Sequence, residues 1–370
     1  MSILDKKRGN IVTKMKITVL NDKRECIMIK KITILTTVFC LIMALTSCGQ
    51  PTASGGPAIK SEPAADGSPT AFVDDLGREV KLAWPEETQG PERVATLIGS
   101  FAQIWTLAGG EVHASADDAW DEFGLEMAED AVNLGNTKEL SLEKLFSAEP
   151  DFIIASANTR QNVEWKETLE KTGVPVAYFR VSNFDEYLNM LKICTEITGR
   201  PDLYEKNGEA IRGQIEAVRA RAAERSEADR SGITEGIIDA TGPKVLSMRA
   251  SASFIRAKNS QDNVLGEILK DLGCINIADS DGSLLENLSI EHILEQDPDY
   301  IFFVQQGDDE AGTKANIERL MKDNPAWLEL TAVKEGRVFF MDKALYGVKP
   351  NHRWGEAYEV VEEILANEES

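Results

Sequence analysis

The sequence is poor in histidine and has no paired cysteines. It holds three histidines in 370 residues, and none of its five cysteines forms a CxxC pair. This argues against a His-rich site for a bare metal ion and against a framework of disulfides. The chain also lacks the GxSxG, HExxH, Walker A and GxGxxG motifs of common enzyme sites. We therefore expect no catalytic residue, no resident metal and no cofactor.

Positive charge is scarce as well. Lys and Arg number 40 against 62 Asp and Glu, and the formal net charge is −22. Because nucleic-acid-binding proteins need a basic surface, this balance argues against a nucleic-acid partner. Hydrophobic residues make up 42% and charged residues 28% of the chain, as in ordinary globular proteins. At 370 residues, the chain is long enough for two domains that each have a core.

One apolar run near the N-terminus is too short for a comfortable membrane span. Lys30 and Lys31 precede the mainly apolar run Ile32–Leu45, which has 14 residues. A basic start followed by an apolar run of this length is typical of a secretory signal. We therefore predict a signal peptide at residues 28–47, and we interpret residues 1–27 as a non-native start extension.

The apolar run ends in Leu45-Thr46-Ser47-Cys48, which resembles the lipobox of bacterial lipoproteins. That resemblance implies that Cys48 becomes the mature N-terminus and carries a diacylglyceryl group. The alternative is an uncleaved anchor followed by a chance cysteine. Removing residues 1–47 brings the net charge to −28, which anionic lipid headgroups repel, so the lipid would have to hold the protein on the membrane. Residues 48–70 are rich in Pro, Gly, Ser and Ala, which predicts a disordered tether.

The stretch 201–230 has the spacing of a long helix with one apolar face. Pro201 suits the first helical position, and Ser231-Gly232 predicts the end of the helix. At about 1.5 Å per residue, the helix would span roughly 40 Å, more than one small domain. The alternative is an ordinary surface helix. The apolar residues on its narrow face are Tyr204, Ile211, Ile215, Val218 and Ala222.

Two similar segments flank this helix. Residues 141–155 and 289–303 align without gaps and are identical at five positions. Each segment predicts a short helix opened by a serine N-cap (Ser141 or Ser289), a Pro-Asp turn and a buried strand. The repeat favours two similar α/β lobes joined by the long helix. The alternative is convergence, because helix–Pro-Asp–strand units are common in α/β proteins.

Other segments alternate between strand and helix patterns, which implies a parallel sheet in each lobe. We expect a hairpin at 71–82 that turns at Asp75-Leu76-Gly77. The further predicted strands are 94–98, 112–116, 152–155, 174–179, 245–249, 254–257 and 338–341. Besides those of the repeat, the predicted helices are 101–107, 122–130, 161–172, 184–198, 264–272, 314–322 and 353–366.

The order of these motifs resembles the class III substrate-binding proteins of ABC transporters, which bind ferric siderophores, haem or cobalamin. The resemblance rests on DDLGREVKL at 74–82, PERVATLIGSFAQIWTLAGG at 91–110, the paired segments and three C-terminal segments, and it covers residues 72–366. It implies an α/β fold of two Rossmann-like lobes joined by one long rigid α-helix, with a ligand cleft between the lobes. We place the N-terminal lobe at 71–200, the bridging helix at 201–230 and the C-terminal lobe at 231–370.

Ligands of such sheets bind beyond the carboxyl ends of the strands. Arg side chains suit carboxylates and catecholates, and aromatic faces suit flat ligands. For each residue the alternative is a surface ion pair, as between Arg353 and Glu356. The predicted ligand residues are Ser100, Phe101, Trp120, Arg160, Arg180, Arg249, Arg256, Lys258, Tyr346, His352 and Arg353, and Lys349 belongs to the same basic group.

Several other residues are predicted to be structural. Trp105 and Trp327 lie on apolar helix faces, and Cys194 and Cys274 have apolar neighbours, so we expect core tryptophans and inert thiols. A haem would need an axial ligand. His352 and Tyr346 lie on suitable loops without a recognisable haem motif, whereas His113 and His292 are predicted to be structural.

The sequence therefore predicts a lipid-anchored receptor on the outer face of the bacterial cytoplasmic membrane. By the resemblance, it would capture a ferric siderophore or similar chelate and pass it to a permease dimer with its ATPase. Cobalamin or haem is the alternative ligand. A surface enzyme that acts on a metal chelate, and an adhesive or sensory lipoprotein, are alternatives of other classes.

The resemblance also implies that one acidic residue on each lobe docks to the permease. The matching positions are Glu143 and Glu291, each in the first turn of its predicted helix. The alternative is that each carboxylate only stabilises its own helix N-terminus.

Overall fold

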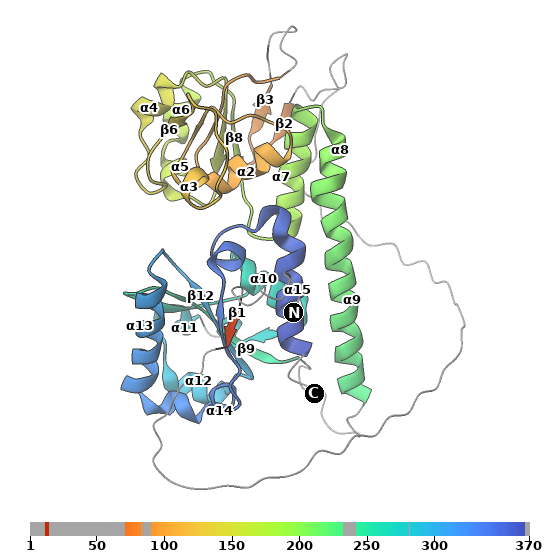
Figure 1. The fold of residues 1–370 in the computed structure, drawn as a ribbon, viewed down its shortest axis with the longest axis vertical. Helices are drawn as coiled ribbons and strands as arrows, with labels where there is room; N and C mark the ends of the chain where they lie inside the picture. The colour runs from red at the N-terminus through yellow and green to blue at the C-terminus, as the bar shows by residue number, and fades with distance from the viewer. Residues whose placement is uncertain are drawn as a thin grey trace, which may run out of the picture.

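In the computed structural model, the structure describes residues 12–14, 71–82, 84, 90–231, 242–280 and 282–366. The predicted signal peptide, Cys48 and the tether lie outside these residues. Figure 1 shows two α/β lobes, one above the other, with one long helix running beside both. Among the described residues, none of the helices has both the length and the apolar character that a membrane span needs.

The N-terminal lobe is built on five parallel strands in the order β6-β5-β4-β7-β8. The central strand β4 is fully buried, as expected for a parallel sheet covered on both faces. The strands are β4 (Val94–Thr96), β5 (Ala114–Ser115), β6 (Val132–Asn133), β7 (Phe152–Ser156) and β8 (Val176–Phe179). The helices are α2 (Gly99–Leu107), α3 (Asp118–Asp121), α4 (Leu142–Ser147), α5 (Arg160–Glu164), α6 (Lys166–Glu170) and α7 (Phe184–Ile197).

The predicted hairpin forms β2 (Ala71–Val73) and β3 (Glu79–Lys81), and its turn covers the edge of β8. The Asp74 carboxylate accepts the backbone N–H of Tyr178 at 3.1 Å, and Asp75 donates its own N–H to the Tyr178 oxygen at 2.9 Å. Arg78 donates to the Val176 oxygen at 2.8 Å. These bonds occupy backbone groups that would otherwise leave an open strand edge.

The C-terminal lobe has a mixed sheet in the order β1-β13-β12-β9-β10, with β11 also paired to β9. Its strands are β9 (Lys244–Ala250), β10 (Ile255–Lys258), β11 (Ile275–Asn276), β12 (Tyr300–Gln305) and β13 (Val338–Met341). Its helices are α10 (Val264–Asp271), α11 (Ser283–Glu286), α12 (Ile290–Gln296), α13 (Glu310–Asp323), α14 (Thr331–Lys334) and α15 (Trp354–Ala366), with short turns at Ile277–Asp279, Pro325–Glu329, Lys343–Gly347 and Asn351–Arg353. The strand β1 (Val12–Lys14) precedes the predicted signal peptide, so the mature protein that we predict would lack it.

The predicted repeat is confirmed by the helices that open it. Ser141 Oγ accepts the N–H of Lys144 at 3.2 Å, and Ser289 Oγ accepts the N–H of His292 at 3.4 Å. Both serines are therefore N-caps of the kind that the pattern predicts.

The turns after these helices are also equivalent. Glu149 and Asp297, at matching positions, have left-handed φ angles of 47° and 41°. Asp151 then accepts the N–H of Arg93 at 2.9 Å, and Asp299 accepts the N–H of Lys244 at 2.8 Å. In each lobe the Pro-Asp turn thus anchors the start of the neighbouring strand.

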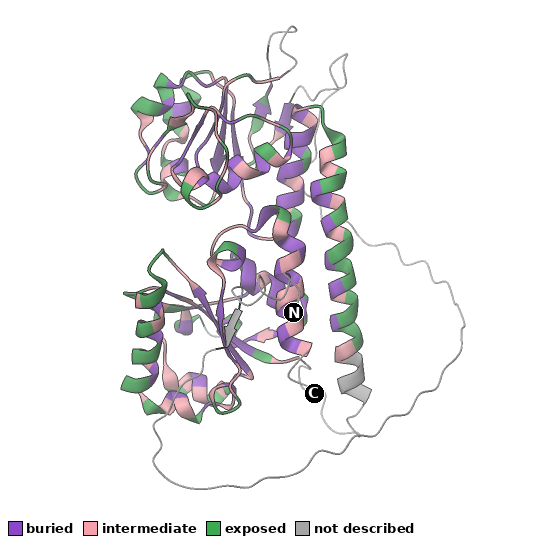
Figure 2. Ribbon diagram, in the orientation of Figure 1, coloured by how far each residue is buried: buried purple, intermediate pink, exposed green. Residues whose placement is uncertain are grey.

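The long helix is continuous but contains one wider turn. It consists of α8 (Pro201–Tyr204), a π-helical turn η1 (Glu205–Glu209) and α9 (Ala210–Ser231). The apolar face is buried as predicted at Ile211, Ile215, Val218 and Ala222, and the outward face of α9 is exposed (Figure 2).

The helix is fastened to both lobes. Asn207 donates its Nδ2–H to the Leu107 oxygen of the N-terminal lobe at 2.8 Å. Further along, Arg221 pairs with Glu359 at 2.5 Å and Arg225 pairs with Glu362 at 2.6 Å, both on α15. These two arginines attach the C-terminal part of the long helix to a neighbouring helix of the C-terminal lobe, and the predicted bridge between lobes is confirmed.

One predicted helix is wrong and another is divided in two. Residues 122–130 form no helix, because α3 ends at Asp121 and Gly124 takes a left-handed φ of 56°. Leu125 and Met127 pack against the core from this loop instead. The predicted helix at 161–172 is divided at Trp165 into α5 and α6.

The tryptophans and cysteines predicted to be structural are buried, whereas His113 and His292 are half-buried. Trp105 and Trp327 are each 1% exposed. Cys194 and Cys274 are free and buried, and burial raises the pKa of both thiols, that of Cys274 to about 12. The prediction that both thiols lie in the core is confirmed, and their inertness stays a prediction.

Candidate ligand-binding site between the lobes

The carboxyl ends of parallel strands from both lobes meet at the lobe junction. Ser100 follows β4, and its backbone oxygen accepts the Nδ2–H of Asn351 from the C-terminal lobe at 2.9 Å. Lys343 follows β13 and forms an ion pair with Glu122 of the N-terminal lobe at 2.6 Å. Ligands of open α/β sheets bind beyond these strand ends. The junction is therefore where the fold favours a ligand, and the predicted cleft there stays a prediction.

Three cations share one face of the β9–β10 hairpin. Arg249 and Arg256 are directly opposite each other in the antiparallel register, and Lys258 is two residues along β10. Arg249 donates to Gln306 Oε1 at 3.2 Å, and the Arg256 guanidinium lies 5.5 Å from the centre of the Phe254 ring. Within the part of the chain that the structure describes, none of the three forms an ion pair. Like charges opposite each other destabilise a sheet, so an anion bound here would relieve repulsion.

Burial acts on two of these cations, Arg249 and Lys258. Burial lowers the pKa of Arg249. Burial, followed by the fields of Arg249 and Arg256, lowers the pKa of Lys258. The surroundings therefore disfavour positive charge at Arg249 and Lys258, and an anionic ligand would reverse this effect.

Lys349 joins these cations to the N-terminal lobe. Its ammonium group lies 5.8 Å from the centre of the Phe101 ring in α2. Burial, followed by the field of Arg249, lowers the pKa of Lys349 to about 8, although Asp118 and Glu186 act in the opposite direction. Lys349 likewise has no ion pair with any described residue. The four residues of this cation cluster are Arg249, Arg256, Lys258 and Lys349.

The N-terminal lobe presents carboxylates at the same junction. Asp118 opens α3, and its Oδ1 accepts the N–H of Gly99 at 2.8 Å. Burial raises the pKa of Asp118 to about 6, with further contributions from Asp117 and Glu122. Carboxylates of one lobe therefore face cations of the other.

The predicted ligand residues of the N-terminal lobe have different environments. Phe101 is fully buried and packs edge-on against Phe179, so its ring does not face solvent. Ser100 is buried, and Trp120 packs partly buried against the same core. Arg160 is exposed and paired with Glu164 at 2.6 Å.

Arg180 is the N-lobe candidate with an unused donor. Its backbone N–H binds Asp75 at 2.6 Å, whereas its buried Nε has no hydrogen-bond partner among the residues that the structure describes. A buried donor of this kind is expected to find a partner, which a ligand oxygen could supply.

Three C-lobe candidates are close in sequence but differ in burial and in their contacts. Tyr346 is 1% exposed and donates its hydroxyl to the Ala357 oxygen at 2.9 Å. His352 is exposed. Arg353 pairs with Glu356 at 2.7 Å, which is the surface ion pair given as the alternative to a ligand role. The ligand roles of all eleven predicted residues stay predictions. Of these residues, the β9–β10 hairpin brings Arg249, Arg256 and Lys258 together.

The sequence pattern does not reveal the residues that connect the two lobes. Lys349 was placed in the basic group but not among the ligand residues, and Asp118, Lys343 and Asn351 were not singled out as contacts. No local sequence pattern identifies these residues, because each makes its contacts only when the two lobes meet.

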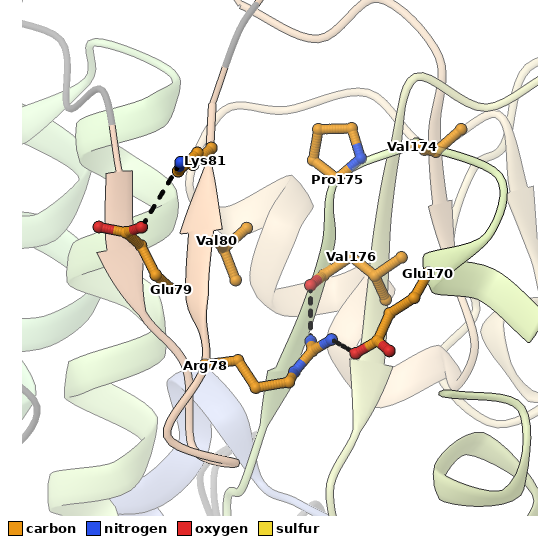
Figure 3. Close-up of a pocket in the computed structure, with 9 residues that line it drawn as sticks. Arg78, Glu79, Val80, Lys81, Glu170, Val174, Pro175 and Val176 are labelled. Atoms are coloured by element: carbon orange, nitrogen blue, oxygen red, sulfur yellow. Dashed lines mark hydrogen bonds and ion pairs between the residues drawn. The ribbon is translucent and has the colours of Figure 1, made fainter. Parts of the chain in front are cut away.

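One surface pocket lies away from the junction. It has a volume of about 440 Å³ and lies between β3 and the segment that leads into β8. Figure 3 shows its Arg78 bound to Glu170 and to the Val176 oxygen, so this cation is already neutralised. Among the described residues, no group of three or more His, Cys, Asp or Glu side chains is placed to hold a metal ion.

Comparison with known proteins agrees with this architecture. The chain is 25% identical over 256 residues to the Fe(3+)-citrate-binding protein YfmC of Bacillus subtilis (strain 168), covering 68% of this chain and 74% of that protein. It is 24% identical over 316 residues to the iron-uptake system-binding protein of the same organism, covering 84% and 90%. Staphylococcus aureus SirA complexed with staphyloferrin B shares the fold, with a TM-score of 0.58, 18% identity and coverage of 80% and 98%.

A family model described as periplasmic binding protein matches residues 94–345, which is more than half of the chain. The match spans the central strands of both lobes and the bridging helix. The chain therefore belongs to the periplasmic binding protein family, as the order of its motifs implied.

Proposed function

We propose that the chain is the extracytoplasmic receptor of an ABC importer, and that it captures an anionic ferric chelate such as a ferric siderophore. The family supports a substrate-binding role, and two relatives are named for Fe(3+)-citrate binding and for iron uptake. The receptor would pass its ligand to a membrane permease that is driven by an ATPase. Iron is cargo in this proposal and not a resident cofactor.

The observation that carries the proposal is the cation cluster. It gathers positive charge at the lobe junction of a chain with a formal net charge of −22. Its Arg249 and Arg256 stand opposite each other, and none of its four cations forms an ion pair with a described residue. Carboxylate or catecholate oxygens of a chelate would supply charge-assisted hydrogen bonds to these groups.

The alternatives have less support. A haem iron needs an axial ligand, and the buried Tyr346 hydroxyl already donates to the Ala357 oxygen. Binding of cobalamin would not require a cluster of four cations. An enzyme on the same scaffold has no support from the relatives, so we propose binding without catalysis.

Attachment and docking complete the proposal. Cys48 would carry the lipid that holds the receptor on the outer face of the membrane. Glu143 and Glu291 would bind the permease, one from each lobe. Both are exposed in the first turn of equivalent helices, while Leu145 and Ile293 beside them are fully buried.

Isothermal titration calorimetry of the mature protein tests the proposal. The panel is ferric citrate, a ferric tris-catecholate, haem and cyanocobalamin at pH 7. We expect one-to-one binding of a ferric chelate that is much tighter than binding of haem or cyanocobalamin. If only haem or cyanocobalamin binds tightly, the proposal that the ligand is a ferric chelate is wrong.

A further inference from the structure

Lys349 differs from the other cations of the cluster because it touches both lobes. Its ammonium group approaches the Phe101 ring of the N-terminal lobe at 5.8 Å. On the C-terminal side it lies within the field of Arg249, which it does not bind. A lysine held between an aromatic ring and another cation has hydrogen-bond donors but no anionic acceptor.

We propose that Lys349 is a ligand-contacting residue that selects an acidic ligand, and that it takes up a proton as the ligand binds. This inference rests on the proposed function, because it requires an anionic ligand at the lobe junction. Its chemistry is simple: the neutral amine of Lys349 accepts one proton from the buffer and becomes an ammonium that donates to a ligand oxygen.

Three charged groups face Lys349 from the elements around it. Arg249 on β9 opposes its positive charge, whereas Asp118 on α3 and Glu186 on α7 favour it. Neither carboxylate forms an ion pair with Lys349, since Asp118 binds the N–H of Gly99 and Glu186 binds the N–H of Ser182 at 2.6 Å. A ligand oxygen in direct contact would therefore give Lys349 the ion pair that these carboxylates do not form.

The pH window follows from the group involved. Burial and Arg249 lower the pKa of Lys349 to about 8, so the free protein loses this charge as the pH rises through 8. A bound anion raises the pKa again, and the protein then takes up protons near pH 8 but not near pH 7 or below. Asp118, with a pKa of about 6, would give linkage in a separate window two units lower.

The test is calorimetric titration at pH 8.0 in HEPES and in Tris, whose different ionisation enthalpies report the protons taken up. The ligand is whichever of ferric citrate and the ferric tris-catecholate binds the wild type more tightly. The proteins are the wild type, Lys349→Arg, Lys349→Met and Lys322→Met. Lys322 is an exposed lysine on α13 and serves as the matched control. The free ligand contributes equally to every titration, so differences in proton count belong to the protein.

We expect the wild type and Lys322→Met to take up about half a proton more than Lys349→Arg at pH 8.0, because the site is then half charged. Lys349→Arg should keep its affinity, since its charge is permanent, whereas Lys349→Met should bind at least tenfold more weakly. Equal proton counts in all four proteins, or unchanged affinity in Lys349→Met, would overturn the inference but leave the receptor function standing. If no ferric chelate of the panel binds the wild type, the proposed function fails and this inference fails with it.

Discussion

Asn351 of the C-terminal lobe donates one Nδ2 group to two acceptors of the N-terminal lobe, the Ser100 backbone oxygen and Gln103 Oε1, each at 2.9 Å. The residue is fully buried and has a left-handed φ of 50°, which Asn tolerates better than most residues. Lys349 lies two positions earlier in the chain. The contact that joins the lobes therefore also fixes the segment that carries a proposed ligand residue.

Removing this contact should destabilise the junction. Asn351→Ala loses both hydrogen bonds and places a side chain in the left-handed region, whereas Asn351→Gly loses the bonds without that strain. We expect Asn351→Gly to cost about 1–3 kcal/mol in the free energy of unfolding and Asn351→Ala about 1–2 kcal/mol more. Urea denaturation measures both. Equal stability of the two variants would show that the backbone strain is unimportant.

Asp118 should make stability depend on pH. Because burial raises the pKa of Asp118 to about 6, the fold holds its proton more tightly than the unfolded chain does. Its stabilising contribution is complete below the unfolded pKa of about 4 and is lost as the pH rises through 6. Asp118→Asn keeps an acceptor for the Gly99 N–H, so we expect it to gain about 1–3 kcal/mol relative to the wild type between pH 4 and pH 7.5. Urea unfolding at both pH values measures this, and parallel pH profiles of the two proteins would contradict it.

Charge reversal tests permease docking separately from ligand binding. We expect Glu143→Arg with Glu291→Arg to leave ligand affinity intact and nearly abolish uptake by cells, because both lobes would repel basic residues of a permease dimer. Glu318→Arg, which reverses an exposed carboxylate on α13, is the control and should transport normally. Normal uptake by the double variant would leave the two carboxylates with a helix-stabilising role alone.

Lipid attachment at Cys48 can be measured directly. The mass of membrane-extracted protein should equal residues 48–370 plus lipid, and Cys48→Ala should be released from the membrane. Two acyl chains are enough for stable anchoring on a membrane, whereas a single chain is not. A Cys48→Ala protein that remains fully membrane-bound would mean that an uncleaved apolar segment holds it.

The sequence predicted those parts of the fold that depend on local pattern. The N-caps Ser141 and Ser289, the hairpin turn at Asp75-Leu76-Gly77 and the apolar face of the long helix follow from spacing and turn chemistry. The helix expected at 122–130 was wrong because Gly124 takes a left-handed φ, which the apolar spacing around it does not reveal. Local rules succeed where tertiary contacts agree with them.

The candidate site was less predictable because it depends on register and on lobe contacts. The sequence identifies Arg249 and Arg256 as basic residues near strand ends, but only strand pairing places them opposite each other. Phe101 and Tyr346 were expected to face the ligand, whereas the structure buries both side chains. Lys349 acquires its environment from Phe101 and Arg249, which are far away in the chain.

The central claim is that the cation cluster binds an anionic ferric chelate, and one measurement tests it most directly. The dissociation constant of the best ferric chelate is compared between the wild type, the Arg249→Gln, Arg256→Gln double variant and the exposed control Arg319→Gln. We predict that the double variant loses at least about 2 kcal/mol of binding free energy, roughly 30-fold in affinity, while the control binds as the wild type does. Wild-type affinity in the double variant would contradict the claim and leave the cluster as a surface feature.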